Sequence, residues 1–146
     1  VLKTLDAAEP SHETETAVSL ESIAERIKRR GLVIIMSDLF DDPEKVLKAL
    51  KHFRHQNHEV IVFQILDPRE TDFKFGSGAN FKDIETGEEI LTQPYQIQKA
   101  YKDTMRDFIN KLKKECLNHH IDYNLISTDM TFDKALKNYL AKRSKM

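Results

Sequence analysis

The chain has 146 residues, which fits a single domain, and its 23 Lys and Arg residues against 24 Asp and Glu residues give a formal net charge of −1. A charge this close to zero argues against a dedicated nucleic-acid binder and against a polybasic membrane anchor. The longest apolar run covers residues 32–36, far short of the roughly 18–20 residues of a membrane span, and residues 1–10 lack the pattern of a signal peptide.

The first part of the chain predicts a lead-in, a helix and a strand. Residues 1–18 are polar and acidic, and we expect them to be extended. Apolar residues then recur at helical spacing, with Ser19 as the expected N-cap and Gly31 as the stop. Residues 32–36 (LVIIM) form the continuous branched run that a strand buried on both faces of a parallel sheet requires.

The middle of the chain predicts a second helix and strand and then an irregular segment. Asp42-Pro43 has the capping carboxylate and proline that open a helix, and an apolar stripe follows. Residues 59–66 (EVIVFQIL) read as a second buried strand. Residues 67–94 break this rhythm, and two short β-like runs within them predict a hairpin over residues 79–92.

The last part predicts a long helix over residues 95–118, a third strand and a final helix capped by Thr131. Strands that alternate with helices pair in parallel through right-handed crossovers. We therefore predict an α/β fold with a Rossmann-like, three-layer parallel sheet and a projecting β-hairpin insertion. Its strands lie near residues 32–37, 59–66 and 121–127, and helices cover both faces.

Ligands of open parallel sheets bind just beyond the carboxyl ends of the strands, which selects the loops at residues 37–42, 67–70 and 127–129. Ser37-Asp38 directly follows a buried strand, and its oxygen atoms are of the type that binds Mg²⁺. In the alternative interpretation, Asp41 or Asp42 caps the next helix and Asp38 orders the turn.

Other reactive residue types have structural interpretations. Cys116 lies on the apolar stripe of the long helix and is expected to be a core thiol. His52, His55 and His58 are expected on a polar surface beside basic residues rather than in a metal site. With one cysteine the chain forms no internal disulfide, so nothing calls for an oxidising compartment, and we expect a cytoplasmic protein.

Four stretches together resemble a known family. Residues 30–42 (RGLVIIMSDLFDD), 65–70 (ILDPRE), 81–89 (FKDIETGEE) and 121–129 (IDYNLISTD) follow the order seen in a bacterial family of unknown function, often encoded beside MoxR-type AAA+ ATPases. They resemble the second half of its von Willebrand factor A-like domain. The resemblance covers roughly residues 14–143. After the polar lead-in over residues 1–18, it implies a partial von Willebrand A-like domain over residues 19–146.

The same resemblance implies a remnant of a metal ion-dependent adhesion site. In von Willebrand A domains an Asp-x-Ser-x-Ser loop, a threonine and a later aspartate hold a divalent cation. Asp38 matches the aspartate, and Thr14 is the candidate threonine, with Thr16 as a near alternative. The Asp-x-Ser-x-Ser loop has no counterpart here, so Mg²⁺ is expected in the full-length protein and no cofactor is assigned to this chain alone.

Two functions from different classes follow. The resemblance implies a non-enzymatic protein-interaction module whose partner is a MoxR-like AAA+ ATPase, with no nucleic acid involved. The alternative is a Mg²⁺-dependent phosphohydrolase or nuclease that uses acidic residues at the strand ends, namely Asp38, Asp41, Asp67 and Asp129. The two differ in whether a nucleophile or general base lies within reach of the metal.

An open sheet edge is also expected. The chain begins with Val1 rather than Met, which suggests a fragment that starts after the strand that would pair with residues 32–36. Unpaired backbone groups beside apolar side chains recruit another strand. We therefore expect a homodimer that covers this edge.

Overall fold

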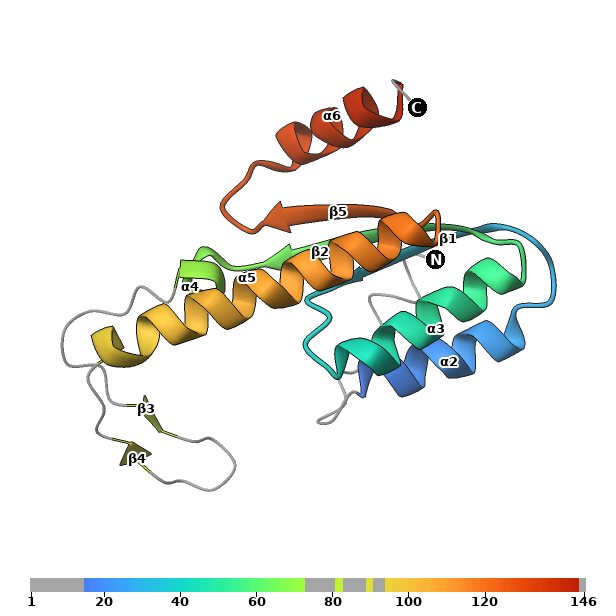
Figure 1. Cartoon of the computed structure of the whole chain (residues 1–146). Helices are drawn as coiled ribbons and strands as arrows, with labels where there is room; N and C mark the ends of the chain where they lie inside the picture. The colour runs from blue at the N-terminus through green and yellow to red at the C-terminus, as the bar shows by residue number, and fades with distance from the viewer. Residues whose placement is uncertain (1–14, 73–80, 83–88, 91–93, 145–146) are drawn as a thin grey trace, which may run out of the picture.

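The computed structural model of the chain describes residues 15–72, 81–82, 89–90 and 94–144. Within these ranges helices and strands alternate (Figure 1). In chain order the elements are α2 (Thr16–Arg26), β1 (Leu32–Ser37), α3 (Pro43–His55), β2 (Glu59–Leu66), α4 (Pro68–Asp72), β3 (Phe81–Lys82), β4 (Glu89–Ile90), α5 (Pro94–Asn118), β5 (Asp122–Ser127) and α6 (Phe132–Arg143).

A three-stranded parallel sheet forms the centre of the fold, and its strand order is β1-β2-β5. Leu32 pairs with Glu59 on one side of β2, and Ile61 pairs with Asp122 on the other. The three predicted strands and their parallel pairing are thus confirmed. The hairpin is also confirmed as an antiparallel pair, β3 with β4, which lies away from the parallel sheet (Figure 1).

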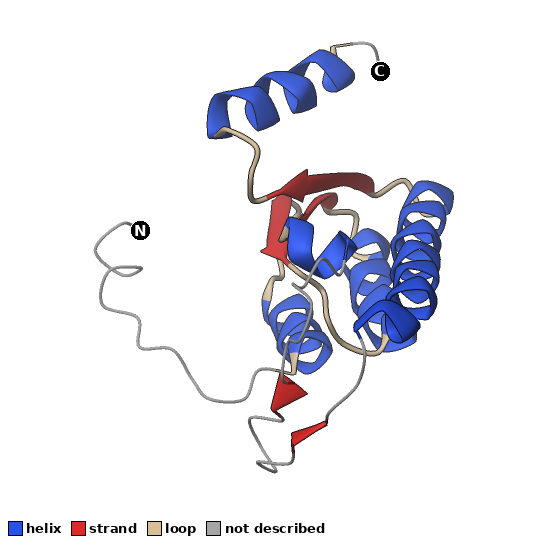
Figure 2. Cartoon of the chain, turned by 90° about the vertical axis from the view of Figure 1, so that its left-hand side faces the viewer, coloured by secondary structure: helices blue, strands red, loops and turns tan. Residues whose placement is uncertain are grey.

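Helices lie on both faces of the sheet, as predicted. Helices α2, α3 and α5 lie on one face and α6 on the other, which Figure 2 shows from the side. The core fills the space below the first face, with Leu50 and Phe53 from α3, Val62 from β2 and Leu112 from α5 fully buried. On the second face, the ring of Tyr139 in α6 packs edge-on against Phe63, with 5.2 Å between centroids.

The boundaries of the first helix differ from the prediction. Helix α2 begins at Thr16, so residues 16–18 are helical and not an extended lead-in, and Ser19 is not its N-cap. The helix ends at Arg26, because Ile27 takes an extended conformation, and Gly31 is therefore not the stop. Residues 1–14 of the predicted lead-in lie outside the described residues.

The reason for the early start is a contact from far along the chain. The backbone N–H of Ala17, in the first turn of α2, donates to Asp41 Oδ2 at 2.9 Å. Free N–H groups at a helix start need acceptors, and here a side chain 24 residues away supplies one. Local spacing cannot reveal such a partner.

His58 also differs from the prediction, because it is buried and not on a polar surface. Its Nδ1 accepts from the backbone N–H of Gly31 at 3.1 Å. The guanidinium of Arg54 donates to the carbonyl oxygen of His58 at 2.6 Å. His58 thus links the residue before β1 to the start of β2.

None of the helices described here combines the length and the apolar character that crossing a membrane requires.

Candidate functional site

The loops that follow the three parallel strands are tied to one another at one edge of the sheet. The backbone N–H of Thr128, after β5, donates to the carbonyl oxygen of Leu66 at the end of β2, at 3.0 Å. The Thr128 hydroxyl donates to Asp67 Oδ2, also at 3.0 Å. Gln64 of β2 donates to the carbonyl oxygen of Asp38, after β1, at 2.8 Å. The structure therefore gathers the three predicted loops.

Asp38 is exposed in a turn that its own side chain helps to order. Its Oδ1 accepts from the backbone N–H of Phe40 at 3.1 Å and from the Ser37 hydroxyl at 3.3 Å. The Ser37 oxygen in turn accepts from the backbone N–H of Leu39 at 3.0 Å. The expectation that Asp38 orders the turn is confirmed, and its role as a metal ligand stays a prediction.

Leu39 has an unusual backbone conformation beside this carboxylate. Its φ is 59°, in the left-handed region that disfavours residues with a Cβ, while its side chain is fully buried. Such a conformation persists only where the surroundings hold it in place. The buried side chain and the Ser37 hydrogen bond hold it here, so the loop presents Asp38 in a fixed way.

A buried amide connects this loop to the rest of the sheet. Gln64 is fully buried, and its Oε1 accepts a hydrogen bond from the Tyr123 hydroxyl of β5. Burial raises the pKa of Tyr123, which keeps the phenol protonated and able to donate. The network from β5 through β2 to Asp38 was not predicted. Its signal in the sequence is the single amide inside the apolar run EVIVFQIL.

The carboxylates of Asp41 and Asp42 each accept a hydrogen bond from the first turn of a helix. Asp42 caps α3 by accepting from the backbone N–H of Glu44 at 2.9 Å, as predicted. Asp41 accepts from Ala17 of α2 and from the N–H of Asp42, and these two bonds lower the pKa of its carboxyl group, the Ala17 bond most. The same contact brings the first turn of α2, which begins at Thr16, against the loop after β1. Thr14 lies outside the described residues.

Asp67 opens the short helix α4, which is absent from the predicted elements. Its Oδ1 accepts from the backbone N–H of Arg69 at 2.8 Å, and this bond, more than the Thr128 hydroxyl, lowers the pKa of Asp67. The Glu70 carboxylate accepts from the N–H of Asp67 at 2.7 Å. The bond from Asp67 to Glu70 is one half of a capping box, while the Asp67 side chain caps the N–H of Arg69, and the sequence Asp-Pro-Arg-Glu carries the signal of this helix start.

The carboxylates that the alternative hydrolase would use thus accept hydrogen bonds from nearby groups. Asp129 resembles the others, because its Oδ1 accepts from the Ser127 hydroxyl at 2.5 Å. Within the described ranges, no group of three or more His, Cys, Asp or Glu side chains is placed to hold a metal ion. Both hydrogen bonds that the described residues donate to the Asp38 carboxylate reach Oδ1, which leaves Oδ2 as an available ligand atom in that part of the chain.

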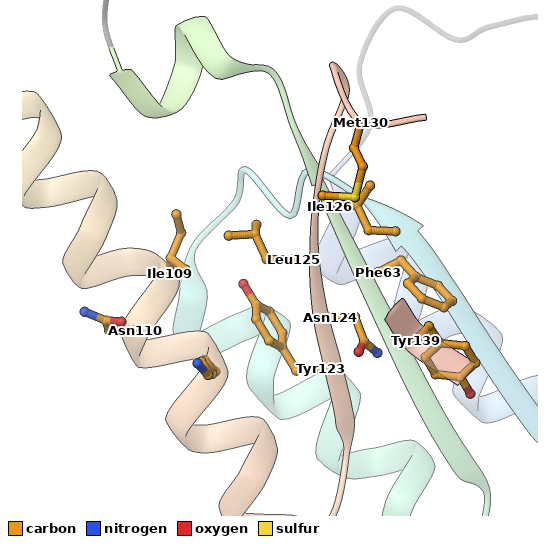
Figure 3. A pocket seen from close by; sticks show the side chains of 10 residues that line it. Phe63, Ile109, Asn110, Tyr123, Asn124, Leu125, Ile126, Met130 and Tyr139 are labelled. Carbon is orange, nitrogen blue, oxygen red and sulfur yellow. The ribbon is translucent and has the colours of Figure 1, made fainter. Parts of the chain in front are cut away.

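A groove of about 520 Å³ runs along β5 between α5 and α6 (Figure 3). Its walls are mainly apolar, and Lys113, Tyr123 and Tyr139 are the ionisable residues among the described ones that line it. In Figure 3, Tyr123 and Leu125 lie toward α5, while Asn124 and Tyr139 lie on the other side of the strand. None of the described residues that line the groove carries a carboxylate, imidazole or thiol for acid–base or nucleophilic chemistry.

Comparison with known proteins gives one match. The family model described as protein of unknown function DUF58 matches residues 1–111, more than half of the chain. Comparison with curated proteins and with solved structures gives no match.

Proposed function

The chain belongs to the DUF58 family of proteins of unknown function, and from that membership we propose that it is a non-enzymatic protein-interaction module. Its motifs and its parallel α/β sheet support a von Willebrand A-like module. The proposed partner is a MoxR-type AAA+ ATPase, because the family that the sequence resembles is often encoded beside genes for such ATPases. A divalent cation held by the full-length protein would bridge Asp38 to a carboxylate of that partner.

The geometry of Asp38 is the observation that carries this proposal. The carboxylate is exposed at the end of a parallel strand, in a loop fixed by Ser37, Leu39 and Gln64. Its Oδ1 is held by local donors, and Oδ2 is available among the described residues. A pre-oriented oxygen ligand on an exposed loop suits a bridging cation better than a buried catalytic centre.

The described residues supply only part of a cation site. Mg²⁺ takes about six oxygen ligands in an octahedral arrangement. Asp38 gives one, and Thr16 lies in the helix turn that is bonded to the same loop. The remaining ligands would come from the Asp-x-Ser-x-Ser loop of the full-length protein. Asp38 therefore contributes to the site and does not form it alone.

Titration calorimetry of the full-length protein against a MoxR-type ATPase of the same organism tests the proposal. With Mg²⁺ we expect a complex that EDTA weakens and that Asp38→Ala weakens by about tenfold or more. Asp129→Ala is the matched control, an exposed carboxylate at the same edge, and should change affinity less than about twofold. Equal binding by Asp38→Ala and wild type would overturn the role of Asp38. Absence of any complex would overturn the partner.

A turnover assay separates the module from the alternative hydrolase. We expect no hydrolysis of nucleotides, nucleic acids or p-nitrophenyl phosphate with Mg²⁺ above the rate of buffer. The reason is that the described acidic residues bond to local donors, and that no group of three or more described His, Cys, Asp or Glu side chains is placed to hold the Mg²⁺ that such a reaction needs. Mg²⁺-dependent turnover that disappears in Asp38→Ala would favour the hydrolase instead.

A further inference from the structure

The three parallel strands begin at one end of the molecule, and the segments that lead into them are bonded to one another there. The backbone N–H of Gly31, before β1, donates to Nδ1 of His58, before β2, at 3.1 Å. Arg54 of α3 donates to the carbonyl oxygen of His58 at 2.6 Å and to that of His119, before β5, at 3.3 Å. Helices α2, α3 and α5 end on the same side, at the right of Figure 1. These hydrogen bonds hold the three segments together as one surface.

This end of the molecule carries a cluster of basic side chains. Residues 25–31 hold four Lys and Arg residues and one Glu, and Lys28, Arg29 and Arg30 of this run are exposed. Among the described residues, none of these three side chains forms an ion pair. His120, before β5, is exposed as well. We call the surface that Lys28, Arg29, Arg30 and His120 form the basic end.

Three carboxylates lie near the basic end, and they do not cancel its charge. Glu59 forms an ion pair with Arg143, and Glu115 forms one with Lys51. Asp122 is half-buried at the start of β5. The charges of Lys28, Arg29 and Arg30 therefore remain available to a partner.

Positive and negative charges are separated along the direction of the strands. At the far end of the sheet, which we call the acidic end, residues 38–44 hold four acidic residues and no basic one. The near-zero net charge argues against a polybasic anchor only for the chain as a whole, because a charged surface responds to the charges that face it. An anionic surface attracts the basic end and repels the acidic end, so it orients the molecule.

Two features of the fold do not account for the basic cluster. Basic residues offset a helix dipole within the last turn, whereas residues 28–30 follow the end of α2 at Arg26. A further strand beside β1, as the proposed function implies, would run along the side of the sheet. Residues 28–30 lie beyond the start of β1, so such a strand would not cover them.

An exposed apolar side chain lies at the same end of the molecule. Leu117, in the last turn of α5, is 74% exposed, the highest value among the large apolar residues that the structure describes. A hollow of about 540 Å³ opens beside Leu117. Its described lining includes three basic residues and two acidic ones, and the acidic ones are the Glu59 and Asp122 discussed above. Basic groups next to apolar ones favour a lipid surface, where phosphates meet the first carbons of the acyl chains.

We propose that the basic end docks on an anionic phospholipid membrane. Lys28, Arg29 and Arg30 then lie against headgroup phosphates, and Leu117 enters the apolar boundary beneath them. A soluble acidic protein would match the charges but would leave the exposed leucine without a role. The docking uses no residue of the proposed cation site, and it leaves the acidic end facing solution.

Co-sedimentation of the chain with vesicles tests the docking. We expect binding to vesicles that mix phosphatidylcholine with an equal share of phosphatidylglycerol, and little binding to phosphatidylcholine alone. Salt raised from about 0.05 M to about 0.5 M should release the chain. Each Lys or Arg near such a surface contributes about fivefold, so Lys28→Ala with Arg29→Ala and Arg30→Ala should weaken binding roughly 100-fold.

The matched control removes three exposed lysines that lie outside the basic end, Lys45→Ala with Lys134→Ala and Lys137→Ala. It changes the net charge by the same amount and should weaken binding less than about threefold. Circular dichroism checks that each variant is folded. Equal losses in the two triple variants, or equal binding to both kinds of vesicle, would overturn the proposal. So would binding to polyglutamate without binding to vesicles, which indicates an acidic protein as the partner.

A tryptophan reporter tests the orientation on the membrane. The chain contains no tryptophan, so Leu117→Trp introduces a single one at the basic end. We expect its fluorescence emission to shift to shorter wavelength with the mixed vesicles, because the indole ring moves from water to the headgroup region. Val18→Trp is the control, since Val18 is 57% exposed in the first turn of α2, at the acidic end, and its emission should stay unchanged. An unchanged Leu117→Trp spectrum, or a shift of Val18→Trp instead, would overturn the proposed orientation.

Discussion

Gln64 is the residue that couples the candidate loop to the sheet. It donates to the Asp38 carbonyl oxygen and accepts from Tyr123, and it is fully buried. A buried polar group that loses its partner keeps the cost of its lost hydration, about 1–3 kcal/mol. The position of Asp38 therefore depends on an amide that lies in the strand after its own.

Replacement of Gln64 tests this coupling. Gln64→Leu removes a partner from both the Asp38 carbonyl and the Tyr123 hydroxyl, so we expect a loss of about 2–4 kcal/mol in the free energy of unfolding. Tyr123→Phe removes one of these bonds and should cost about 1–2 kcal/mol. The double variant should lose less than the sum of the two, because they share a bond. Urea denaturation measures all three. A Gln64→Leu variant as stable as wild type would contradict the network.

The lowered pKa of Asp41 predicts how the free energy of unfolding depends on pH. Its pKa is lowered in the folded chain, chiefly by the Ala17 N–H, so its stabilising effect is complete above the unfolded value of about 3.9 and is lost as pH falls through the folded value. Asp41→Asn should lower the free energy of unfolding by about 0.5–1 kcal/mol at pH 7, allowing for solvent screening, and by less at pH 3.

Urea unfolding at pH 7, 5 and 3 checks this trend. Glu25→Gln, an exposed carboxylate on the same helix, is the control and should show a small difference at every pH. A deficit of Asp41→Asn that is as large at pH 3 as at pH 7 would show that the charge of Asp41 does not stabilise α2.

Cys116 provides a test of the core. It is fully buried on α5, as predicted, and burial raises the pKa of its thiol to about 12. Only the thiolate reacts, so we expect the native chain at pH 8 to be labelled by a maleimide at least ~100-fold more slowly than the urea-unfolded chain. Leu117→Cys places a thiol at the next, exposed position and should label rapidly. Rapid labelling of Cys116 in the native chain would contradict the described packing of α5.

At the residue scale, the sequence predicts contacts that are local. Asp42 followed by Pro43 predicted a cap that the structure confirms, because the acceptor and its donor are two residues apart. Asp41 and Ala17 are far apart in sequence, and so are His58 and Gly31. No window along the chain contains both members of such a pair, so the start of α2 and the burial of His58 could not be foreseen.

At the element scale, apolar runs identify the strands well. Residues 59–66 form the central strand β2 and contain few polar side chains, since both faces of an inner parallel strand favour apolar residues. Residues 32–37 are equally apolar, although β1 lies at the edge of the described sheet. The exposed side chains on β1 show the limit of this reasoning. The sequence predicted that residues 32–36 are buried on both faces, and this prediction is wrong in the described structure, because Leu32, Ile34 and Met36 are exposed on the face away from the core.

The helices on the two faces of the sheet differ in how many described contacts hold them to it. Helices α2, α3 and α5 share one continuous core with β1, β2 and β5. The described side chains of helix α6 contact the other face through the Phe63–Tyr139 ring pair and an ion pair of Arg143 with Glu59. An exposed ion pair contributes little, and one ring pair contributes about 0.5–1.5 kcal/mol. Among the described side chains, the contacts on the first face are therefore more extensive than those on the second.

Hydrogen exchange followed by mass spectrometry tests this difference. Peptides from β2 should exchange most slowly, through global unfolding, because the strand is central and its side chains are buried. Peptides from α6 should exchange faster, through local detachment of the helix. Tyr139→Ala removes the ring pair and should speed exchange in α6 several-fold while leaving β2 unchanged. Phe53→Ala, in the core, should instead speed exchange in β2, since it destabilises the whole fold by about 3–5 kcal/mol. Exchange in α6 as slow as in β2 would show that both faces unfold as one unit.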